Sequence, residues 1–492
     1  MTMTTHLSTL VFLGDFVFKF RNHVRFNFLD LSTVEMRRSD CEREVELNQR
    51  LAPDIYLGVG ELTLADQVIE PVVIMRRLPR NSSLTALLRG GAIPFEELRS
   101  IARVLVEFHS FAIRSPKVDA DATAQSILRR WSDNFAQTST LVDAILDSDV
   151  EVKIQSLARQ YIAGRDMLFD QRISSRAICD GHGDLQASDI FLLPDGPRIL
   201  DCLEFDDHLR HLDVVDDLSF LLMDLERLSA PEAAKFLRNF YEELSDTHAP
   251  GSLFDHYGAY HAYVRAKVAC LRADQDNNAA SEARSLQRLA LEFLERSRIQ
   301  LIIVGGLPGT GKSTISRLVG EQIDAVVLRS DELRHEIVLQ SNVSSDSPSY
   351  RQGNYSPEMT FATYSIMLDR AEVMLRNGTS VILDASWISS EYRSMAFDLA
   401  EATASEFIEL RCVLDDSIAA QRINARRRRG DDVSEATIDI ARLMASDVDQ
   451  WRTAAVIDTS LTQNRCLNMA LKAIGKVPTT RSKKRVRADS TP

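Results

Sequence analysis

Residues 306–313 read G-L-P-G-T-G-K-S and directly follow the apolar run I-Q-L-I-I-V of residues 299–304. This pattern is typical of a phosphate loop, in which consecutive backbone N–H groups point inward at phosphate oxygens and glycine allows the tight curl. A buried strand before the loop and a helix after it are the context that such a loop requires. The sequence therefore predicts a nucleotide-binding site at the end of a strand.

The residues of this loop have separate expected roles. Lys312 is expected to reach the β- and γ-phosphates and is predicted to be catalytic, and the Ser313 hydroxyl is expected to bind Mg2+. The helix that begins here would turn the positive end of its dipole toward the same anion. The predicted nucleotide-binding residues are Gly306, Leu307, Pro308, Gly309, Thr310, Gly311, Lys312, Ser313 and Thr314.

Composition limits the class of protein. The chain has 492 residues, which predicts about two or three domains. Asp and Glu outnumber Lys and Arg by 71 to 58, so a general electrostatic grip on nucleic acid is not expected. No stretch approaches the roughly 20 apolar residues of a membrane span, and no export signal is visible. Six scattered cysteines without a C-x-x-C pair predict reduced thiols and a cytoplasmic protein: Cys41, Cys179, Cys202, Cys270, Cys412 and Cys466.

The strongest boundary lies at residues 296–298, where a charge-rich helical segment gives way to the phosphate-loop strand. We predict an α/β protein with an α+β unit over residues 1–297 and a doubly wound parallel-sheet domain over residues 298–478. Residues 479–492 are polar and basic without an apolar face, which predicts a disordered tail.

Further candidate residues follow the later strands of the second domain. Asp331 lies where the strand of residues 325–328 ends, and a carboxylate there can accept a proton from a hydroxyl. Arg334 shares its helical face and can hold an anionic or polar substrate, although the pair could instead be a helix-terminal Asp with a solvated Arg. Asp384 follows the apolar run of residues 381–383, where an acidic residue positions Mg2+ or caps the next segment.

A cluster of cations at residues 421–430, Q-R-I-N-A-R-R-R-R-G, is unusual in an acidic chain. An arginine-rich lid can neutralise charge on a transferred phosphoryl group. Arg422 and Arg426, one helical turn apart, are the predicted phosphate contacts, while any one residue of the run 426–429 could equally be solvated.

These features together resemble the P-loop small-molecule kinases, the group that includes gluconate kinase, polynucleotide 5'-kinase and zeta-toxin-type kinases. The resemblance covers residues 299–475 and includes the S-D-x-x-R segment at 330–334, V-I-L-D-A-S-W at 381–387 and V-I-D-T at 456–459. It implies that Asp331 is the catalytic base and that Arg334 contacts the substrate.

A second group of acidic residues lies in the first domain. Residues 182–185 read H-G-D-L, and Asp184, Asp189 and Asp201 fall on two adjacent loops. One carboxylate can orient an attacking hydroxyl while the others ligate Mg2+, although aspartate also favours turns for purely conformational reasons.

This stretch resembles the catalytic loop of the aminoglycoside phosphotransferases and their protein-kinase-like relatives, which reads H-G-D-x-x-x-x-N. The resemblance implies that Asp184 is the catalytic base and Asp201 a metal ligand. Asp189 replaces the usual Asn and can still bind Mg2+. Asp213 and Asp217 would brace the loop. Lys19 would anchor the nucleotide and could pair with Glu44, but no glycine-rich loop precedes it.

The whole chain looks like the bacterial proteins that fuse such a kinase-like domain to a P-loop kinase-like domain. We therefore predict an ATP- and Mg2+-dependent phosphotransferase that acts on a hydroxyl of a small polar acceptor. The alternatives are a nucleotide-controlled regulatory protein with a pseudokinase-like first domain and a polynucleotide 5'-hydroxyl kinase. The oligomeric state is left open.

Overall fold

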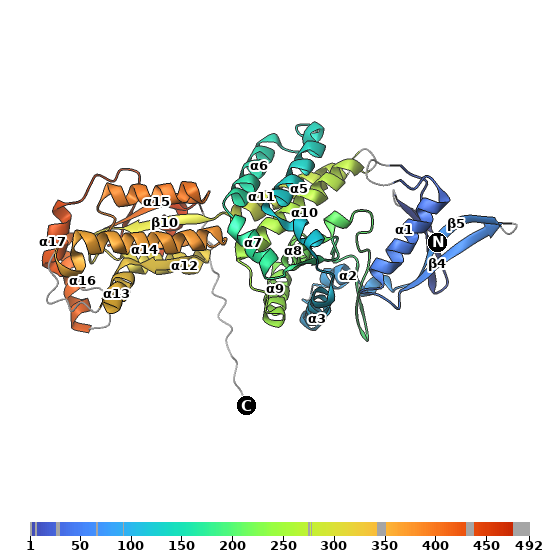
Figure 1. Cartoon of the computed structure of the whole chain (residues 1–492), viewed down its shortest axis with the longest axis horizontal. Helices are drawn as coiled ribbons and strands as arrows, with labels where there is room; N and C mark the ends of the chain where they lie inside the picture. Colours follow the sequence, from blue (N-terminus) through green and yellow to red (C-terminus); the bar gives the residue numbers. More distant parts are fainter. Residues whose placement is uncertain are drawn as a thin grey trace, which may run out of the picture. The chain divides into compact units, whose positions relative to one another are not determined.

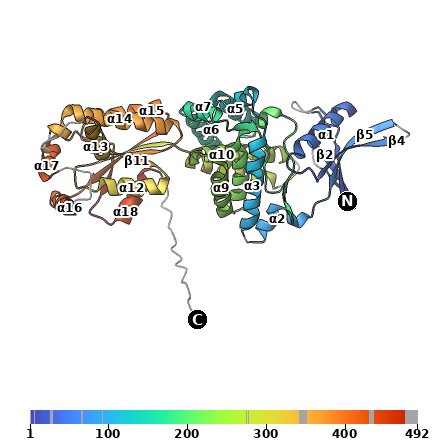
Figure 2. The same ribbon diagram turned by 60° about the horizontal axis from the view of Figure 1, so that its bottom comes forward.

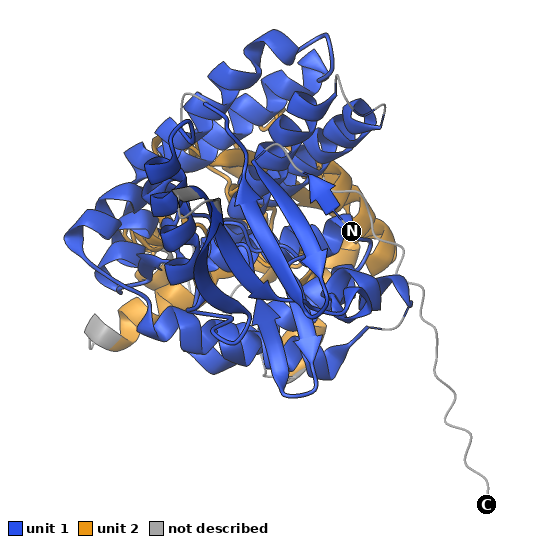
Figure 3. Cartoon of the chain, turned by 90° about the vertical axis from the view of Figure 1, so that its right-hand side faces the viewer, with its two compact units in different colours: residues 1–297 blue, residues 298–492 orange. Residues whose placement is uncertain are grey.

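A computed structural model describes residues 2–4, 7–25, 30–64, 67–91, 93–273, 276, 278–341, 351–429 and 437–475. The chain forms two compact units, Met1–Ser297 and Arg298–Pro492, coloured separately in Figure 3. The predicted basic tail at 479–492 lies outside the described residues, as do positions 476–478.

Unit 1 opens with an antiparallel five-stranded sheet in the order β1-β2-β3-β5-β4 (Figure 1). β2 and β3 form a hairpin whose turn holds Gly14 at a φ of 57°, a conformation that glycine adopts without strain. Helix α1 begins after Thr33, whose side chain accepts a hydrogen bond from the backbone N–H of Met36, and it packs on the sheet. The elements are β1 (Thr2–Thr4), β2 (Ser8–Leu13), β3 (Phe16–Arg21), α1 (Val34–Asn48), β4 (Tyr56–Leu64) and β5 (Gln67–Arg76).

The rest of unit 1 is mainly helical and carries two short strand pairs, β6 with β9 and β7 with β8. Helix α8 is buried along most of its length, so it forms the centre of this part. The helices are α2 (Leu84–Arg89), α3 (Phe95–Phe111), α4 (Pro116–Asp119), α5 (Ala124–Thr138), α6 (Ser148–Ala163), α7 (Asp166–Ser174), α8 (Val214–Arg227), α9 (Pro231–Ser245), α10 (Gly251–Arg272) and α11 (Ala279–Arg296). Short 3-10 turns are η1 (Arg80–Ser82), η2 (Ala120–Ala122), η3 (Ser139–Leu141) and η4 (Asp207–Leu209), and the strands are β6 (Ile178–Asp180), β7 (Ile190–Leu193), β8 (Gly196–Ile199) and β9 (His211–Asp213).

Unit 2 contains a parallel five-stranded sheet in the order β11-β12-β10-β13-β14. Figure 2 shows α14 and α15 on one face of this sheet and α12 and α18 on the other, so the sheet is doubly wound. Its strands are β10 (Gln300–Gly305), β11 (Val326–Arg329), β12 (Val381–Asp384), β13 (Glu406–Val413) and β14 (Ala455–Asp458). Its helices are α12 (Lys312–Ile323), α13 (Ser330–Ser341), α14 (Pro357–Arg376), α15 (Ser390–Ala402), α16 (Asp416–Arg429), α17 (Ile438–Ser446) and α18 (Gln463–Ala473), with η5 at Gly353–Tyr355.

The predicted α/β fold class is confirmed by this architecture. β10 lies in the middle of the sheet, between β12 and β13, and its apolar residues belong to the core. The carboxyl end of a central parallel strand is where ligands bind in doubly wound sheets, so β10 delivers the phosphate loop to the expected edge.

Two general features concern the whole described chain. All six cysteines are buried, and the structure pairs none of them in a disulfide. Among the described residues, none of the helices combines the length and the apolar character that crossing a membrane demands.

Candidate active site

The phosphate loop follows β10 and depends on glycine at defined positions. Gly306, Gly309 and Gly311 have φ values of 140°, 84° and 90°, which residues with a side chain rarely adopt. A Cβ atom on Gly309 would lie 2.7 Å from the carbonyl oxygen of Ala419. The loop therefore leaves no room for larger residues, as close approach of backbone to phosphate requires.

Lys312 is the first residue of α12, and its Nζ donates to the carbonyl oxygen of Leu307 at 3.2 Å. Thr310 is buried, and its hydroxyl donates to the same carbonyl at 2.7 Å. These contacts keep the loop curled. Of the predicted loop residues, Pro308, Gly309, Gly311, Lys312, Ser313 and Thr314 line a pocket of about 1170 Å³, and Gly306, Leu307 and Thr310 shape the loop behind it.

Asp384 ends β12 beside Arg329, its register neighbour on β11. Asp384 is 4% exposed, and its Oδ2 accepts no hydrogen bond from the described residues. Arg329 Nε lies 3.6 Å from that oxygen, and Arg329 Nη2 donates to Ser313 Oγ at 3.4 Å. Burial raises the pKa of Asp384, and the charge of Lys312 opposes this. The buried carboxylate oxygen of Asp384 and the nearby Ser313 hydroxyl are oxygen ligands of the kind that Mg2+ prefers, and the cationic side chains beside them suit the phosphates that Mg2+ accompanies.

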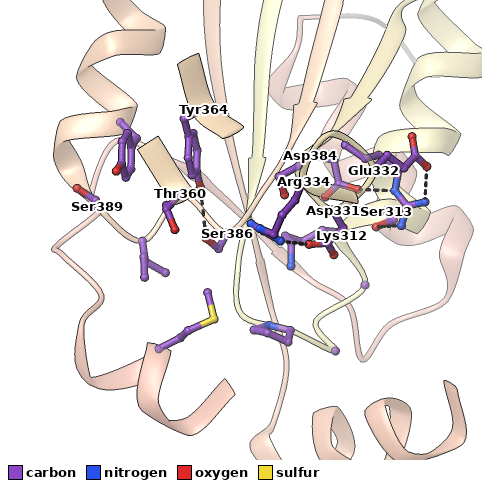
Figure 4. Close-up of a pocket in the computed structure, with 18 of the residues that line it drawn as sticks. Lys312, Ser313, Asp331, Glu332, Arg334, Thr360, Tyr364, Asp384, Ser386 and Ser389 are labelled. Atoms are coloured by element: carbon purple, nitrogen blue, oxygen red, sulfur yellow. Dashed lines mark hydrogen bonds and ion pairs between the residues drawn. The ribbon is translucent and has the colours of Figure 1, made fainter. Parts of the chain in front are cut away.

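Asp331 and Arg334 lie in the first turn of α13 and line the same pocket. Arg334 Nη1 donates to Asp331 Oδ1 at 2.7 Å, as Figure 4 shows. The Arg334 side chain is 12% exposed and that of Asp331 29%, so the carboxylate is the more accessible partner. The guanidinium fixes the orientation of the carboxylate that is predicted to act as base.

The far end of the pocket contains residues that the sequence did not identify. Tyr364 is buried, yet it lines the pocket and stacks on Tyr392 with ring centroids 4.3 Å apart. Its hydroxyl accepts a hydrogen bond from the backbone N–H of Trp387 at 3.1 Å. Other polar lining residues that the sequence did not suggest are Arg351, Thr360, Ser386, Ser389, Asp447 and Asp449. They come from segments that are far apart in the sequence, so no single local pattern links them.

The arginine cluster lies on α16. Arg422 and Arg426 line the pocket, and Arg422 Nη2 donates to the carbonyl oxygen of Thr459 at 2.9 Å. The Thr459 hydroxyl donates to the carbonyl oxygen of Thr310 at 2.6 Å and so links α16 to the phosphate loop. Arg427 and Arg428 are exposed, and the side chain of Arg429 lies outside the described atoms.

In unit 1, Lys19 on β3 forms the ion pair with Glu44 that the sequence suggested, at 2.7 Å. Lys19 Nζ also donates to Asp201 Oδ1 at 3.2 Å, and its charge lowers the pKa of Asp201. Arg21, two residues further along β3, pairs with Glu44 and Glu204. The small sheet is thus joined by charge pairs to the loop that follows β8.

The predicted catalytic loop has the acidic character that a base requires. Burial and the charge of Asp201 raise the pKa of Asp184 to about 6, and Gln186 Nε2 donates to Asp184 Oδ1 at 2.9 Å. Burial also raises the pKa of Asp189, together with the charges of Asp201 and Asp184. Asp201 is already paired with Lys19. A metal ion shared by Asp184, Asp189 and Asp201 therefore stays a prediction.

Helix α8 braces this loop from both ends. Asp217 accepts hydrogen bonds from the backbone N–H groups of His182 at 2.7 Å and Gly183 at 3.0 Å, the bracing role that was predicted for it. Asp224, which the sequence analysis missed, accepts from the backbone N–H of Ala187 at 3.0 Å. These two carboxylates are seven residues apart and so share one helix face, a spacing that could have indicated the pair.

Asp213 has a different role from the one predicted. Its carboxylate pairs with Arg172 through two hydrogen bonds of 2.7 Å, and it caps α8 by accepting from the backbone N–H of Val215. It therefore anchors α7 to the start of α8, because both of its oxygens face Arg172.

Residues 301–449 match a family model described as AAA domain. This range includes the phosphate loop, Asp331, Arg334 and Asp384, and the match agrees with the prediction of an ATP-binding, kinase-like domain in this part of the chain.

Solved structures resemble parts of the chain at low identity. A gluconokinase from Sinorhizobium meliloti is 15% identical over 36% of this chain and 93% of its own, with a TM-score of 0.27. The APS kinase CysC from Mycobacterium tuberculosis, in complex with AMPPNP and APS, is 18% identical over 36% and 99%, with a TM-score of 0.28. A choline/ethanolamine kinase family protein from Mesorhizobium loti is 11% identical over 60% and 91%, with a TM-score of 0.37.

Similarity over nearly the whole length is found with mycobacterial proteins. The uncharacterized proteins Rv2004c of Mycobacterium tuberculosis and Mb2027c of Mycobacterium bovis are each 38% identical to this chain over 469 residues. The alignments cover 95% of this chain and 93% of each relative, so they span both units. The chain therefore belongs to the same protein family as these two mycobacterial proteins.

Proposed function

We propose that unit 2 is an ATP- and Mg2+-dependent phosphotransferase that transfers the γ-phosphate to a hydroxyl of a small polar acceptor. One observation carries this proposal: Lys312, Ser313, Asp331, Arg334 and Asp384 all line a single pocket at the carboxyl edge of the parallel sheet. Lys312 supplies a positive charge for the phosphates, and Ser313 and Asp384 supply two oxygen atoms for a metal ion. Asp331 supplies a base, and Arg334 supplies a contact to the acceptor.

The volume and lining of the pocket support the class of acceptor. Ligand pockets usually measure about 300–1,000 Å³, so about 1170 Å³ leaves room for a nucleotide and a small second substrate. The end beyond Arg334 carries hydroxyl, carboxylate and guanidinium groups beside the stacked pair of Tyr364 and Tyr392. Such a surface suits a polar molecule with several hydrogen-bonding groups.

Each of these pocket residues has a proposed role in phosphoryl transfer. Ser313 and Asp384 would hold Mg2+, which, when bound, neutralises charge on the phosphate oxygens. Lys312 and the loop N–H groups bind the β- and γ-phosphates, and Arg334 orients the acceptor. Asp331 accepts the hydroxyl proton while the acceptor oxygen bonds to the γ-phosphorus and the bond to the bridging oxygen breaks, releasing ADP.

For unit 1 we propose a kinase-fold domain of the aminoglycoside-phosphotransferase type with Asp184 as its candidate base. The Lys19–Glu44 pair and the contact from Lys19 to Asp201 support this, because a Lys–Glu pair and a metal-binding aspartate are what protein-kinase-like sites require. The elevated pKa of Asp184 is also suited to a group that exchanges protons.

The experiment is an acceptor screen on the intact protein with radiolabelled ATP and Mg2+. The panel contains polyols, sugars, amino alcohols, nucleosides and a 5'-hydroxyl oligonucleotide. We expect transfer that Lys312→Ala lowers at least about 100-fold, leaving only the residual activity of unit 1, and that the exposed control Lys472→Ala preserves. Loss only with Asp184→Ala would move the chemistry to unit 1, and ATP binding without any transfer would contradict the proposal and favour the regulatory alternative.

A further inference from the structure

Asp121, His208 and His211 form a compact cluster in unit 1, outside the residues to which catalytic roles were assigned. Asp121 lies in η2, His208 in η4 and His211 at the start of β9. Each can offer one ligand atom, and all three atoms lie within 4.8 Å of one another. Among the described residues it is the one group of three or more histidine, cysteine or acidic side chains whose ligand atoms all lie this close together.

Both imidazoles face the same oxygen atom. His208 Nδ1 lies 2.8 Å and His211 Nδ1 2.6 Å from Asp121 Oδ2. Arg130 Nη2 donates to the backbone carbonyl of Asp121 at 2.7 Å and so fixes the segment that carries the carboxylate. The three side chains are therefore oriented toward one point before any ligand is present.

The chemistry and spacing of the trio suit a transition metal. Two histidine nitrogens and one carboxylate oxygen are common ligands of Zn2+, at about 2.0–2.2 Å from the ion. In a tetrahedral site, ligand atoms at this distance from the ion are about 3.4 Å from one another, so the histidine–carboxylate contacts of 2.8 and 2.6 Å would have to lengthen by about 0.6–0.8 Å to admit the ion. Three ligands leave a fourth tetrahedral position open.

Two of the three side chains are buried, and the third is exposed to solvent. The side chains of Asp121 and His211 are 11% and 6% exposed, whereas that of His208 is 67% exposed. Two ligands are thus held by packing, and the third can admit an ion from solvent. We propose that Asp121, His208 and His211 form a binding site for one divalent transition-metal ion of the Zn2+ type.

A bound ion would stiffen the segment behind the predicted catalytic loop. Arg210 lies between the two histidines, and its guanidinium donates to Asp180 Oδ1 at 2.9 Å and to the carbonyl oxygen of Leu203 at 2.8 Å. The backbone carbonyl of Arg210 accepts from the N–H of Gly181 at 2.9 Å. The metal would therefore tie η2 to the chain on which the H-G-D-L loop rests, a structural role distinct from phosphoryl transfer.

The test is Co2+ titration of the intact, chelator-treated protein without an affinity tag, followed by visible absorption and by elemental analysis after dialysis. His208→Ala is the main variant because an exposed residue can be removed without a cavity, and Asp121→Asn is the second. The matched control is His23→Ala, since His23 is also 67% exposed beside a carboxylate, Glu70, but belongs to no such group of three among the described residues.

We expect one ion per chain, d–d bands of a tetrahedral site, and a melting temperature of unit 1 that rises with Zn2+. His208→Ala and Asp121→Asn should weaken binding at least about tenfold, while His23→Ala should bind like the wild type. Absence of a stoichiometric ion in the wild type would overturn the proposal. Equal binding by wild type and His208→Ala would overturn it as well.

Discussion

Replacing Asp217 by alanine should strongly destabilise unit 1, because it removes a buried carboxylate that several donors share. Asp217 is completely buried and accepts three hydrogen bonds, from the backbone N–H groups of His182 and Gly183 and from His109 Nε2 at 3.0 Å. The variant Asp217→Ala leaves all three donors buried without this acceptor. The loop that carries Asp184 would then lose its anchor on α8.

The size of the loss follows from these contacts. A buried donor without an acceptor costs about 1–3 kcal/mol. Because the three contacts share one carboxylate, the losses overlap, and we expect a decrease of about 4 kcal/mol in the free energy of unfolding. The exposed control Asp170→Asn should change it by less than about 0.5 kcal/mol.

The effect should depend on pH in a defined direction. Burial alone would raise the pKa of Asp217, but the hydrogen bond and charge of His109 outweigh it and hold that pKa well below its usual range. A carboxylate with a lowered folded-state pKa stabilises above its unfolded pKa of about 3.9, and this contribution is lost as pH falls through the folded-state value. The difference between wild type and Asp217→Asn should therefore shrink in acid.

Urea unfolding followed by fluorine NMR of 5-fluorotryptophan separates the units, because Trp131 is in unit 1 and Trp387 and Trp451 are in unit 2. The Trp131 signal should report the loss, and the other two signals should keep their midpoints. A change below about 1 kcal/mol at neutral pH would refute the reasoning, since it would mean that the three donors find other partners at no cost.

Three further predictions concern the sites. Gly309→Ala should weaken ATP binding at least about tenfold, because a Cβ atom would lie 2.7 Å from the carbonyl oxygen of Ala419 and the backbone has a φ of 84°. Titration with a fluorescent ATP analogue measures the affinity. An unchanged affinity would contradict the loop geometry. In transfer assays, Asp331→Asn should lower kcat about 100-fold or more, since a general base contributes about 10²–10⁴-fold to the rate. The affinity for ATP should stay within about twofold of the wild type. An unchanged kcat would exclude Asp331 as the base. Phosphoryl transfer that survives in Lys312→Ala should fall about tenfold per pH unit below about pH 6. The reason is that Asp184 must be ionised to accept a proton, and its pKa is about 6. A flat pH profile of transfer between about pH 5 and 7 would exclude Asp184 as the base.

The phosphate loop and the strands around it were predictable because their signals are local. An apolar run, glycines at fixed spacing and Lys312 determine strand, turn and helix within about 20 residues, and the structure has β10 and α12 there. The start of α14 likewise has a local cause, because Ser356 caps it by accepting a hydrogen bond from the backbone N–H of Met359.

Contacts set by topology were not predictable in the same way. Arg329 faces Asp384 only because β11 and β12 are neighbours in parallel register, and the strand order is not written in either segment. The same reason explains the missed pocket residues Arg351, Tyr392 and Asp447, which lie on separate elements. Asp213 was assigned to the wrong partner because sequence proximity to Asp217 says nothing about Arg172, 41 residues away.

The most direct test of the central claim, that the pocket of unit 2 is the nucleotide site, is calorimetric titration of the intact protein with ATP in the presence of Mg2+. We expect tight ATP binding by the wild type and by Lys472→Ala, and binding at least about 100-fold weaker by Lys312→Ala. The reason is that Lys312, at the start of α12, is the cationic side chain expected to bind the phosphates. Equal affinity of Lys312→Ala and wild type would contradict the claim and locate the nucleotide elsewhere in the chain.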